Sequence, residues 1–126
     1  MGAIAACALP GAVTVMAGGT LCAPDDPSLP HGVELKGAIS FEEGGTITHA
    51  GIATRAANSQ FFTVPLMLLA PGATLTDAEL AALPIVTGLP SNWIAKAKQE
   101  TVTVNGVART AVSAEIKFGA TVIILR

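Results

Sequence analysis

The chain has 126 residues and a net charge of −2; 51% of its residues are hydrophobic and only 13% are charged. This length favours a single domain, and the charged fraction is about half the roughly 25% of an ordinary soluble domain. The seven basic residues are scattered, which excludes a nucleic-acid-binding face, and no apolar run has the roughly 20 residues of a membrane-spanning helix. A lone monomer of this composition would expose apolar surface, so we expect other subunits to cover part of it.

The first 24 residues carry no charged side chain. They lack the basic start of a signal peptide, and Pro10 and several glycines interrupt their apolar residues. Three prolines follow between Ala23 and Gly32, which indicates an extended connector, because proline donates no backbone hydrogen bond. We therefore predict an extended N-terminal arm and connector over 1–32 and a β-rich domain over 33–126. No internal repeat is evident.

Both cysteines, Cys7 and Cys22, lie in the first quarter of the chain. Neither a C-x-x-C motif nor a nearby histidine accompanies them, which argues against a zinc or redox site. Two small buried thiols are favoured, because alanine and glycine surround them, and a disulfide between them stays geometrically open.

The β-rich domain opens with alternating apolar and polar residues over 33–41, which predicts a half-buried strand. Residues 42–45, Glu-Glu-Gly-Gly, predict a loop, and 46–53 is expected to be the return strand of a hairpin. The apolar run over 61–69 predicts another strand, and Pro65 within it indicates an edge position or a bulge.

One short helix is predicted at Thr76. Thr76 and Glu79 have the spacing of a capping box, and Leu75 and Leu80 have the spacing of a hydrophobic staple. Pro84 ends this helix after about two turns, so we expect the helix to be stable only where it lies on the sheet.

The last third of the chain contains the clearest turn signal. Residues 91–99 fit a helix face and a strand about equally well. Asn105-Gly106, between apolar alternating segments, predicts a type I′ hairpin whose second strand continues to Ile116. Residues 121–125 predict a buried strand. Together these elements predict a mainly β fold, a β-sandwich or jelly-roll-like domain with one short helix and the N-terminal arm.

Few ionisable groups are available for catalysis. His31 lies among prolines and His49 lies within a predicted strand, and no local spacing brings them to other metal ligands. Glu42 and Glu43 are adjacent, which is typical of a solvated turn rather than of a pair of catalytic carboxylates. No Gly-x-Ser-x-Gly or phosphate-binding motif occurs. We therefore predict no enzymatic activity, no metal and no cofactor.

Aromatic and apolar residues are the candidates for an interface. Trp93 has two interpretations, a core anchor or an interface hot spot. Phe61 and Phe62 are adjacent in a strand, so one is expected to fill the core while the other meets a neighbouring subunit. The N-terminal arm adds the remaining candidates, which are Met1, Ile4, Leu9, Val13 and Val15.

Two segments carry a resemblance to a known group of proteins. The segment Gly45-Thr46-Ile47-Thr48-His49-Ala50-Gly51-Ile52, followed by Phe62-Thr63-Val64-Pro65-Leu66, resembles small bacteriophage virion proteins, as does the ending from Gly119 to Leu125. This resemblance covers about half of the chain and implies a capsid decoration (cement) protein or a tail or fibre component. Neither class has catalytic residues to transfer.

These observations lead to a functional prediction. We expect a non-enzymatic structural subunit of a bacteriophage particle, located in the virion and assembled in the host cytoplasm, with a cement role favoured. Its expected partners are the major capsid protein or other virion proteins and further copies of itself, with a trimer favoured because it matches local axes of a capsid. No nucleic acid or membrane is expected. The alternatives are a tail or tail-fibre attachment protein and a carbohydrate-binding module, for which one Trp and no Tyr supply few aromatic platforms.

Overall fold

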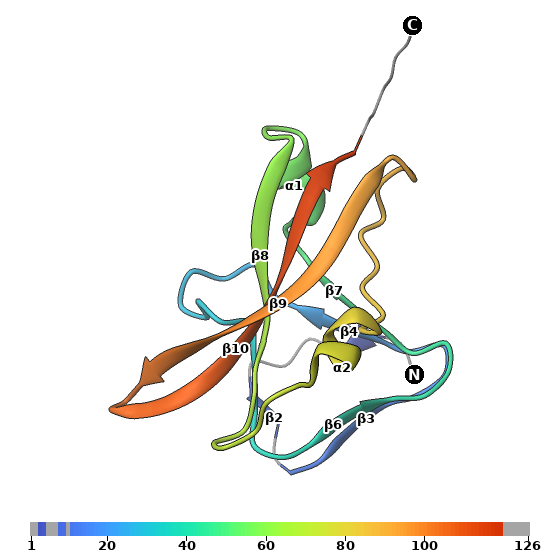
Figure 1. Cartoon of the computed structure of the whole chain (residues 1–126). Helices are drawn as coiled ribbons and strands as arrows, with labels where there is room; N and C mark the ends of the chain where they lie inside the picture. The colour runs from blue at the N-terminus through green and yellow to red at the C-terminus, as the bar shows by residue number, and fades with distance from the viewer. Residues whose placement is uncertain (1–2, 5–7, 10, 120–126) are drawn as a thin grey trace, which may run out of the picture.

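A computed structural model describes residues 3–4, 8–9 and 11–119. It is mainly β, as predicted, with two short helices (Figure 1). The elements are β1 (Ala3–Ile4), β2 (Ala8–Leu9), β3 (Val13–Val15), β4 (Thr20–Ala23), β5 (Val33–Leu35), β6 (Ile39–Phe41), β7 (Thr46–His49), α1 (Ile52–Ala56), β8 (Phe61–Leu68), α2 (Asp77–Ala81), β9 (Trp93–Val104) and β10 (Val107–Phe118).

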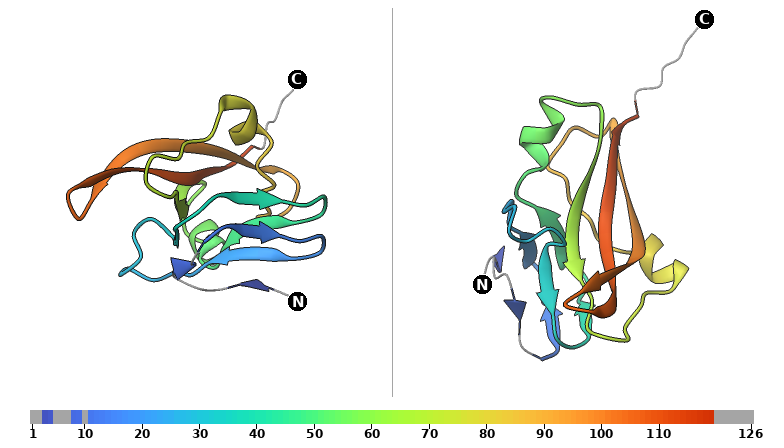
Figure 2. Two further views of the ribbon diagram at one scale, coloured as in Figure 1. Left: turned by 90° about the horizontal axis from the view of Figure 1, so that it is seen from below. Right: turned by 90° about the vertical axis from the view of Figure 1, so that its left-hand side faces the viewer.

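The first eight strands wind as a short parallel β-helix. Successive coils contribute β1, β4 and β7 to one side, β2, β5 and β8 to a second side, and β3 and β6 to the third. Every pair within these three sides is parallel. Figure 2 shows the resulting stack of short strands from below. Sandwiches and jelly rolls are built from antiparallel strands, so that finer prediction is not confirmed.

Two coils of this stack are in register at an offset of 26 residues. Thr20 pairs with Thr46, and their side-chain hydroxyl oxygens are 2.9 Å apart, 26 positions apart in the chain. The three residues Gly18-Gly19-Thr20 recur at this offset as Gly44-Gly45-Thr46, and Leu21 is matched by the similar Ile47. The chain therefore contains a short internal repeat, contrary to the expectation of none, and its single recurrence over four residues explains why it is hard to see.

The predicted hairpin between 33–41 and 46–53 is wrong. The segment 33–41 breaks into β5 and β6 around Gly37, where a Cβ atom would lie 2.6 Å from the carbonyl carbon of Gly11. β6 and β7 then pair with β3 and β4 of the preceding coil rather than with each other. The end of the predicted return strand is α1, a second helix that the sequence did not indicate.

The second half of the chain adds an antiparallel sheet to the β-helix. β8 pairs in parallel with β5 on one side and antiparallel with β10 on the other, and β9 completes the order β2-β5-β8-β10-β9. The register slips by one residue between Ser113, opposite Pro65, and Val112, opposite Met67. The bulge predicted from Pro65 is therefore confirmed, whereas an edge position for its strand is wrong.

Local signals in this half are confirmed. Asn105 and Gly106 have φ angles of 52° and 79°, as a type I′ hairpin requires, and β9 and β10 extend 12 residues each on either side. The ambiguous segment 91–99 lies mostly in β9. The Glu79 N–H donates to the Thr76 hydroxyl over 3.1 Å, and the Thr76 N–H donates to the Glu79 carboxylate over 2.8 Å, so the capping box of α2 is complete. The strand predicted over 121–125 lies outside the described residues.

The core lies between the coils and the antiparallel sheet. Leu21 and Ile47 stack inside the β-helix, and Leu66, Val112 and Ile116 reach the same cluster from β8 and β10. Burial of these side chains stabilises each by about 1.5–3 kcal/mol. Since the coils and the sheet share one core, the structure explains why such short strands hold together.

A buried arginine joins the antiparallel sheet to the β-helix. Arg109 of β10 is 8% exposed, and its guanidinium donates to the carbonyl oxygens of Leu35 (2.9 Å) and Leu69 (2.9 and 3.1 Å). Its third partner is the Glu34 carboxylate in β5, which accepts a hydrogen bond of 2.9 Å from the guanidinium. Arg109 therefore bridges β10, β5 and the chain just after β8.

Candidate assembly surfaces

The antiparallel sheet has one buried and one exposed face. Side chains of β8 alternate between them: Val64 and Leu66 are fully buried, whereas Phe61 and Thr63 are exposed. We call the exposed side of β8, β10 and β9 the outer face; it carries Phe61, Thr63, Ile94, Lys96, Lys98, Glu115 and Lys117.

Two large apolar side chains lie at one end of the outer face. Lys117 of β10 is level with Phe61 on one neighbouring strand and with Ile94 on the other. Phe61 is 58% exposed and Ile94 is 49% exposed. Neighbouring strands in a sheet are about 4.8 Å apart, so these two side chains flank Lys117 in one row. We call Phe61, Ile94 and Lys117 the apolar row.

The rest of the outer face is polar. Lys98 and Glu115 form an ion pair 3.2 Å long, and their side chains are 42% and 38% exposed. An exposed ion pair of this kind contributes at most about 1 kcal/mol to the stability of the fold. The outer face is therefore a small apolar end followed by a charged strip.

The three aromatic candidates have different surroundings. Phe61 and Phe62 lie on opposite faces of β8, and Phe62 packs against the core while Phe61 is exposed. Trp93 is half-buried, and its ring centroid lies 6.1 Å from that of Phe62 and 5.3 Å from that of Phe118. These contacts fit the core-anchor interpretation of Trp93, and its role in an interface stays a prediction.

The predicted N-terminal arm contributes strands to the β-helix. Ile4 lies in β1 and Leu9 in β2, while Met1 is outside the described residues. Val13 is half-buried against the core, and Val15 is 2% exposed. The Val15 side chain therefore belongs to the core and has no surface to offer a partner.

The first cysteine, Cys7, is also outside the described residues, so the disulfide question stays open. Cys22 in β4 is half-buried.

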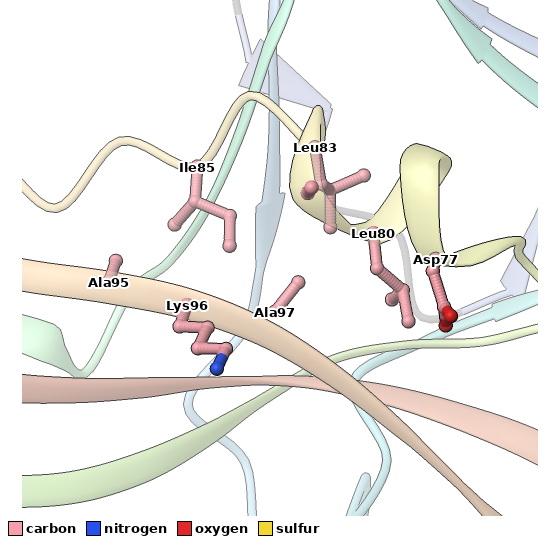
Figure 3. A pocket seen from close by; sticks show the side chains of 8 residues that line it. Asp77, Leu80, Leu83, Ile85, Ala95, Lys96 and Ala97 are labelled. Carbon is pink, nitrogen blue, oxygen red and sulfur yellow. The ribbon is translucent and has the colours of Figure 1, made fainter.

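A pocket of about 450 Å³ lies between α2 and β9 (Figure 3). Leu80, Leu83 and Ile85 form its roof on the α2 side, and Ala95 and Ala97 project toward them from β9. Asp77 and Lys96 also line it. Its walls are thus mainly apolar, with one acidic and one basic side chain. Next to the pocket, the Gln99 side chain of β9 is bonded to the backbone of Leu75. It donates to the Leu75 carbonyl (2.7 Å) and accepts from the Leu75 N–H (3.0 Å).

One histidine is buried beside an ion pair. His49 is 4% exposed, and its Nδ1 accepts a hydrogen bond from the Gly51 N–H over 2.9 Å. Asp25 and Arg55 form an ion pair 3.1 Å long next to it. Burial lowers the pKa of His49, the positive charge of Arg55 lowers it further, and Asp25 opposes both. The structure thus brings Asp25 and His49 to one place and favours a neutral imidazole there.

The other candidate ionisable groups have local structural contacts. The Asp26 carboxylate accepts hydrogen bonds from the Ser28 N–H and hydroxyl, which lower the pKa of Asp26. Glu42 accepts a hydrogen bond from the Ala17 N–H over 3.2 Å. Within residues 11–119, no three His, Cys, Asp or Glu side chains are grouped so that they could hold a metal ion.

The described helices are both too short to cross a membrane. Comparison of the chain with protein-family models, with curated proteins and with solved structures finds no match.

Proposed function

We propose that this chain is a non-enzymatic structural subunit of a bacteriophage particle, and most specifically a capsid decoration protein that binds the major capsid protein and further copies of itself. The observation that carries the proposal is the apolar row, in which the exposed Phe61 and Ile94 flank Lys117 on one face of a chain of which only 13% is charged. Apolar side chains that gather on one surface are typical of protein contacts, whereas singly scattered ones are not.

The mechanism of such a subunit is mechanical. A subunit that binds the assembled particle, and not the dissociated capsid proteins, shifts the equilibrium toward the particle by mass action and so stabilises it. Of the expected interface residues, Val15 is buried in the core and is not part of the proposed contact. The proposal rests on the apolar row, which contains the expected residue Phe61, and the protein would reside in the virion.

The test is self-association of the purified chain. Replacing Phe61 and Ile94 together by serine removes the apolar side chains of the row, which are both exposed. We expect the double variant to raise the dissociation constant for association at least tenfold by light scattering or sedimentation, because most binding energy comes from a few apolar residues. Val107→Ser is the matched control, since Val107 is also 49% exposed but lies at the far end of β10. Equal association of wild type and double variant would contradict the proposal.

A tail or tail-fibre attachment protein is the alternative within the same class. Ring or fibre symmetry of the associated chain without any contact with the capsid, seen by electron microscopy, would favour it over a capsid location.

One observation favours a carbohydrate-binding module. A hollow of about 440 Å³ is lined by Trp93 and Phe118 together with Asn58, Ser59 and Gln60, which combines aromatic rings with amide groups. If this alternative holds, soluble polysaccharides should change the fluorescence of Trp93, the single tryptophan of the chain. Unchanged fluorescence with every polysaccharide tested would rule against it.

A further inference from the structure

The pocket between α2 and β9 opens along the edge of a strand. Its lining includes the three consecutive residues Ala95, Lys96 and Ala97. Successive side chains of a strand point to opposite faces, so a pocket over one face would contact alternate residues only. Contact with all three therefore places the pocket beside the backbone of β9, with Ala95 and Ala97 facing its roof (Figure 3).

The backbone groups at this edge point away from the sheet. The Gly119 N–H donates to the Asn92 carbonyl over 2.6 Å, whereas the Phe118 N–H donates to Gln60, just before β8. Because the register of β9 with β10 is unbroken, even-numbered residues of β9 direct their N–H and C=O groups at β10. The groups of Ala95 and Ala97 therefore point outward, and in the described part of the chain β10 is the one strand that pairs with β9.

This edge has the properties of a site for an added strand. An unpaired strand edge is a template for another strand, and main-chain hydrogen bonds then supply affinity while pockets select side chains. At one end of this edge the Trp93 N–H already donates to the Pro90 carbonyl over 3.0 Å, so the open stretch runs from Ala95 to Gln99. Its five residues span about 14 Å at roughly 3.4 Å per residue step. At Gln99 the hydrogen bonds to Leu75 bring another segment against β9 and limit the site.

The sequence contains an occupant of matching length and chemistry. Residues 121–125, Thr-Val-Ile-Ile-Leu, are uncharged and four of the five are β-branched. Such a run favours a strand that is covered on both faces. Five residues in a strand span about 14 Å, which fits the open stretch from Ala95 to Gln99. The apolar roof formed by Leu80, Leu83 and Ile85 would cover one of its faces.

The reach of the chain favours a second copy over the same copy. Phe118 is opposite Trp93 on β10, so a strand added beside Ala95 lies two strand spacings across and two residue steps along, about 12 Å away. Three residue steps from Phe118 to Thr121 extend at most about 10–11 Å in a straight line. The straight line passes through β9 itself, where Asn92 enters and bonds to Gly119. Three steps are therefore too few to bring Thr121 of the same copy beside Ala95, which favours a second copy as the source of the added strand.

We propose that the edge of β9 and the adjoining pocket bind residues 121–125 of a second copy of this chain as an added strand. This inference rests on the proposed function as a self-associating structural subunit and names the contact between copies. Each copy has one such edge and one segment 121–125, so the proposed contact is either reciprocal in a dimer or closes a ring such as a trimer.

Cross-linking between two variants tests the contact directly. In a background in which Cys7 and Cys22 are serine, one protein carries Lys96→Cys at the rim of the pocket, and the other carries Arg126→Cys beyond the apolar run. Equimolar mixing with a short bismaleimide should give a covalent heterodimer. The matched control replaces Lys96→Cys with Glu43→Cys, an exposed position in the corner between β6 and β7, and should give at least tenfold less product.

The outcomes separate this inference from the proposed function. No excess of the Lys96→Cys product over the control, in a chain that still associates by light scattering, would overturn the inference and leave the proposed function standing. A product within single chains of the Lys96→Cys, Arg126→Cys double variant at high dilution would show that the same copy occupies the edge, which also overturns it. A chain that stays monomeric and gives no product would contradict both.

A second variant pair tests the pocket without cross-linking. Ala97→Leu fills the space that the added strand needs and keeps an apolar residue, so it should weaken association at least tenfold. Ala108→Leu makes the same change at an exposed position of β10 outside the pocket and should leave association unchanged. Equal association of both variants and wild type would count against the proposed contact.

Discussion

Arg109 and His49 show how single polar residues hold this fold together. Both are almost fully buried; His49 accepts a hydrogen bond from the N–H of nearby Gly51, whereas Arg109 donates to carbonyls that are distant in the chain. Arg109 lies 74 positions from Leu35 in the chain, and no local pattern predicts such a contact. Their roles depend on the packing of coils against the antiparallel sheet, and this is why the sequence indicated neither.

Arg109→Ala should cost about 3 kcal/mol of unfolding free energy in urea denaturation. The loss leaves two buried carbonyl oxygens and the Glu34 carboxylate without their donor, and the value lies at the lower end for a buried pair because Glu34 is 38% exposed. Arg55→Ala is the control: its ion pair with Asp25 is partly exposed and should contribute less than about 1 kcal/mol. Equal losses for the two variants would refute the bridging role of Arg109.

His49 should make stability depend on pH. Its pKa is lowered in the fold, chiefly by burial and then by Arg55, so the unfolded chain binds the proton more readily. Stability is therefore complete above the unfolded pKa of about 6.5 and falls as the pH drops below it, toward the lowered folded value. Protonation also opposes the hydrogen bond from Gly51 to Nδ1.

Unfolding free energies of wild type and His49→Gln between pH 7.5 and pH 5 would measure this effect. Glutamine can accept the Gly51 N–H bond and does not titrate, so the variant should lose the slope that the wild type shows over this range. An identical slope in the two proteins would exclude His49 as its source.

Among the helices and strands, short sequence motifs predicted caps and turns correctly but did not predict which strands pair. The capping box at Thr76 and the turn at Asn105-Gly106 are complete within a few residues, and both are confirmed. The alternation over 33–41 correctly marks buried and exposed positions, but it is the same for parallel and antiparallel strands. The hairpin was therefore wrong, although most of the residues assigned to strands were right.

Gly45 tests the repeat of the β-helix. A Cβ atom there would lie 2.5 Å from the Val15 carbonyl oxygen of the preceding coil, whereas one at the equivalent Gly19 would lie 3.2 Å from that of Met16. Gly45→Ala should therefore cost about 2 kcal/mol of unfolding free energy by overpacking, and Gly19→Ala distinctly less. Chemical denaturation of both variants compares them, and a larger loss for Gly19→Ala would contradict the observed register of the coils.

In the molecule as a whole, part of each candidate surface could be predicted from the sequence and part could not. Low charge and the pair Phe61-Phe62 predicted an exposed aromatic residue in a β-rich chain, and the structure places Phe61 on the outer face. The apolar row and the pocket beside β9 could not be predicted, because each joins residues from strands or helices far apart in the chain. The assembly itself stays a proposal.

The mass of the purified chain in solution, measured by light scattering over a range of concentrations, shows whether the chain associates with copies of itself. A structural subunit that associates through the apolar row and the edge of β9 should approach a whole multiple of 12.6 kDa as the concentration rises, with three copies favoured. A mass that stays at 12.6 kDa up to millimolar concentration would contradict the account of this chain as a self-associating subunit.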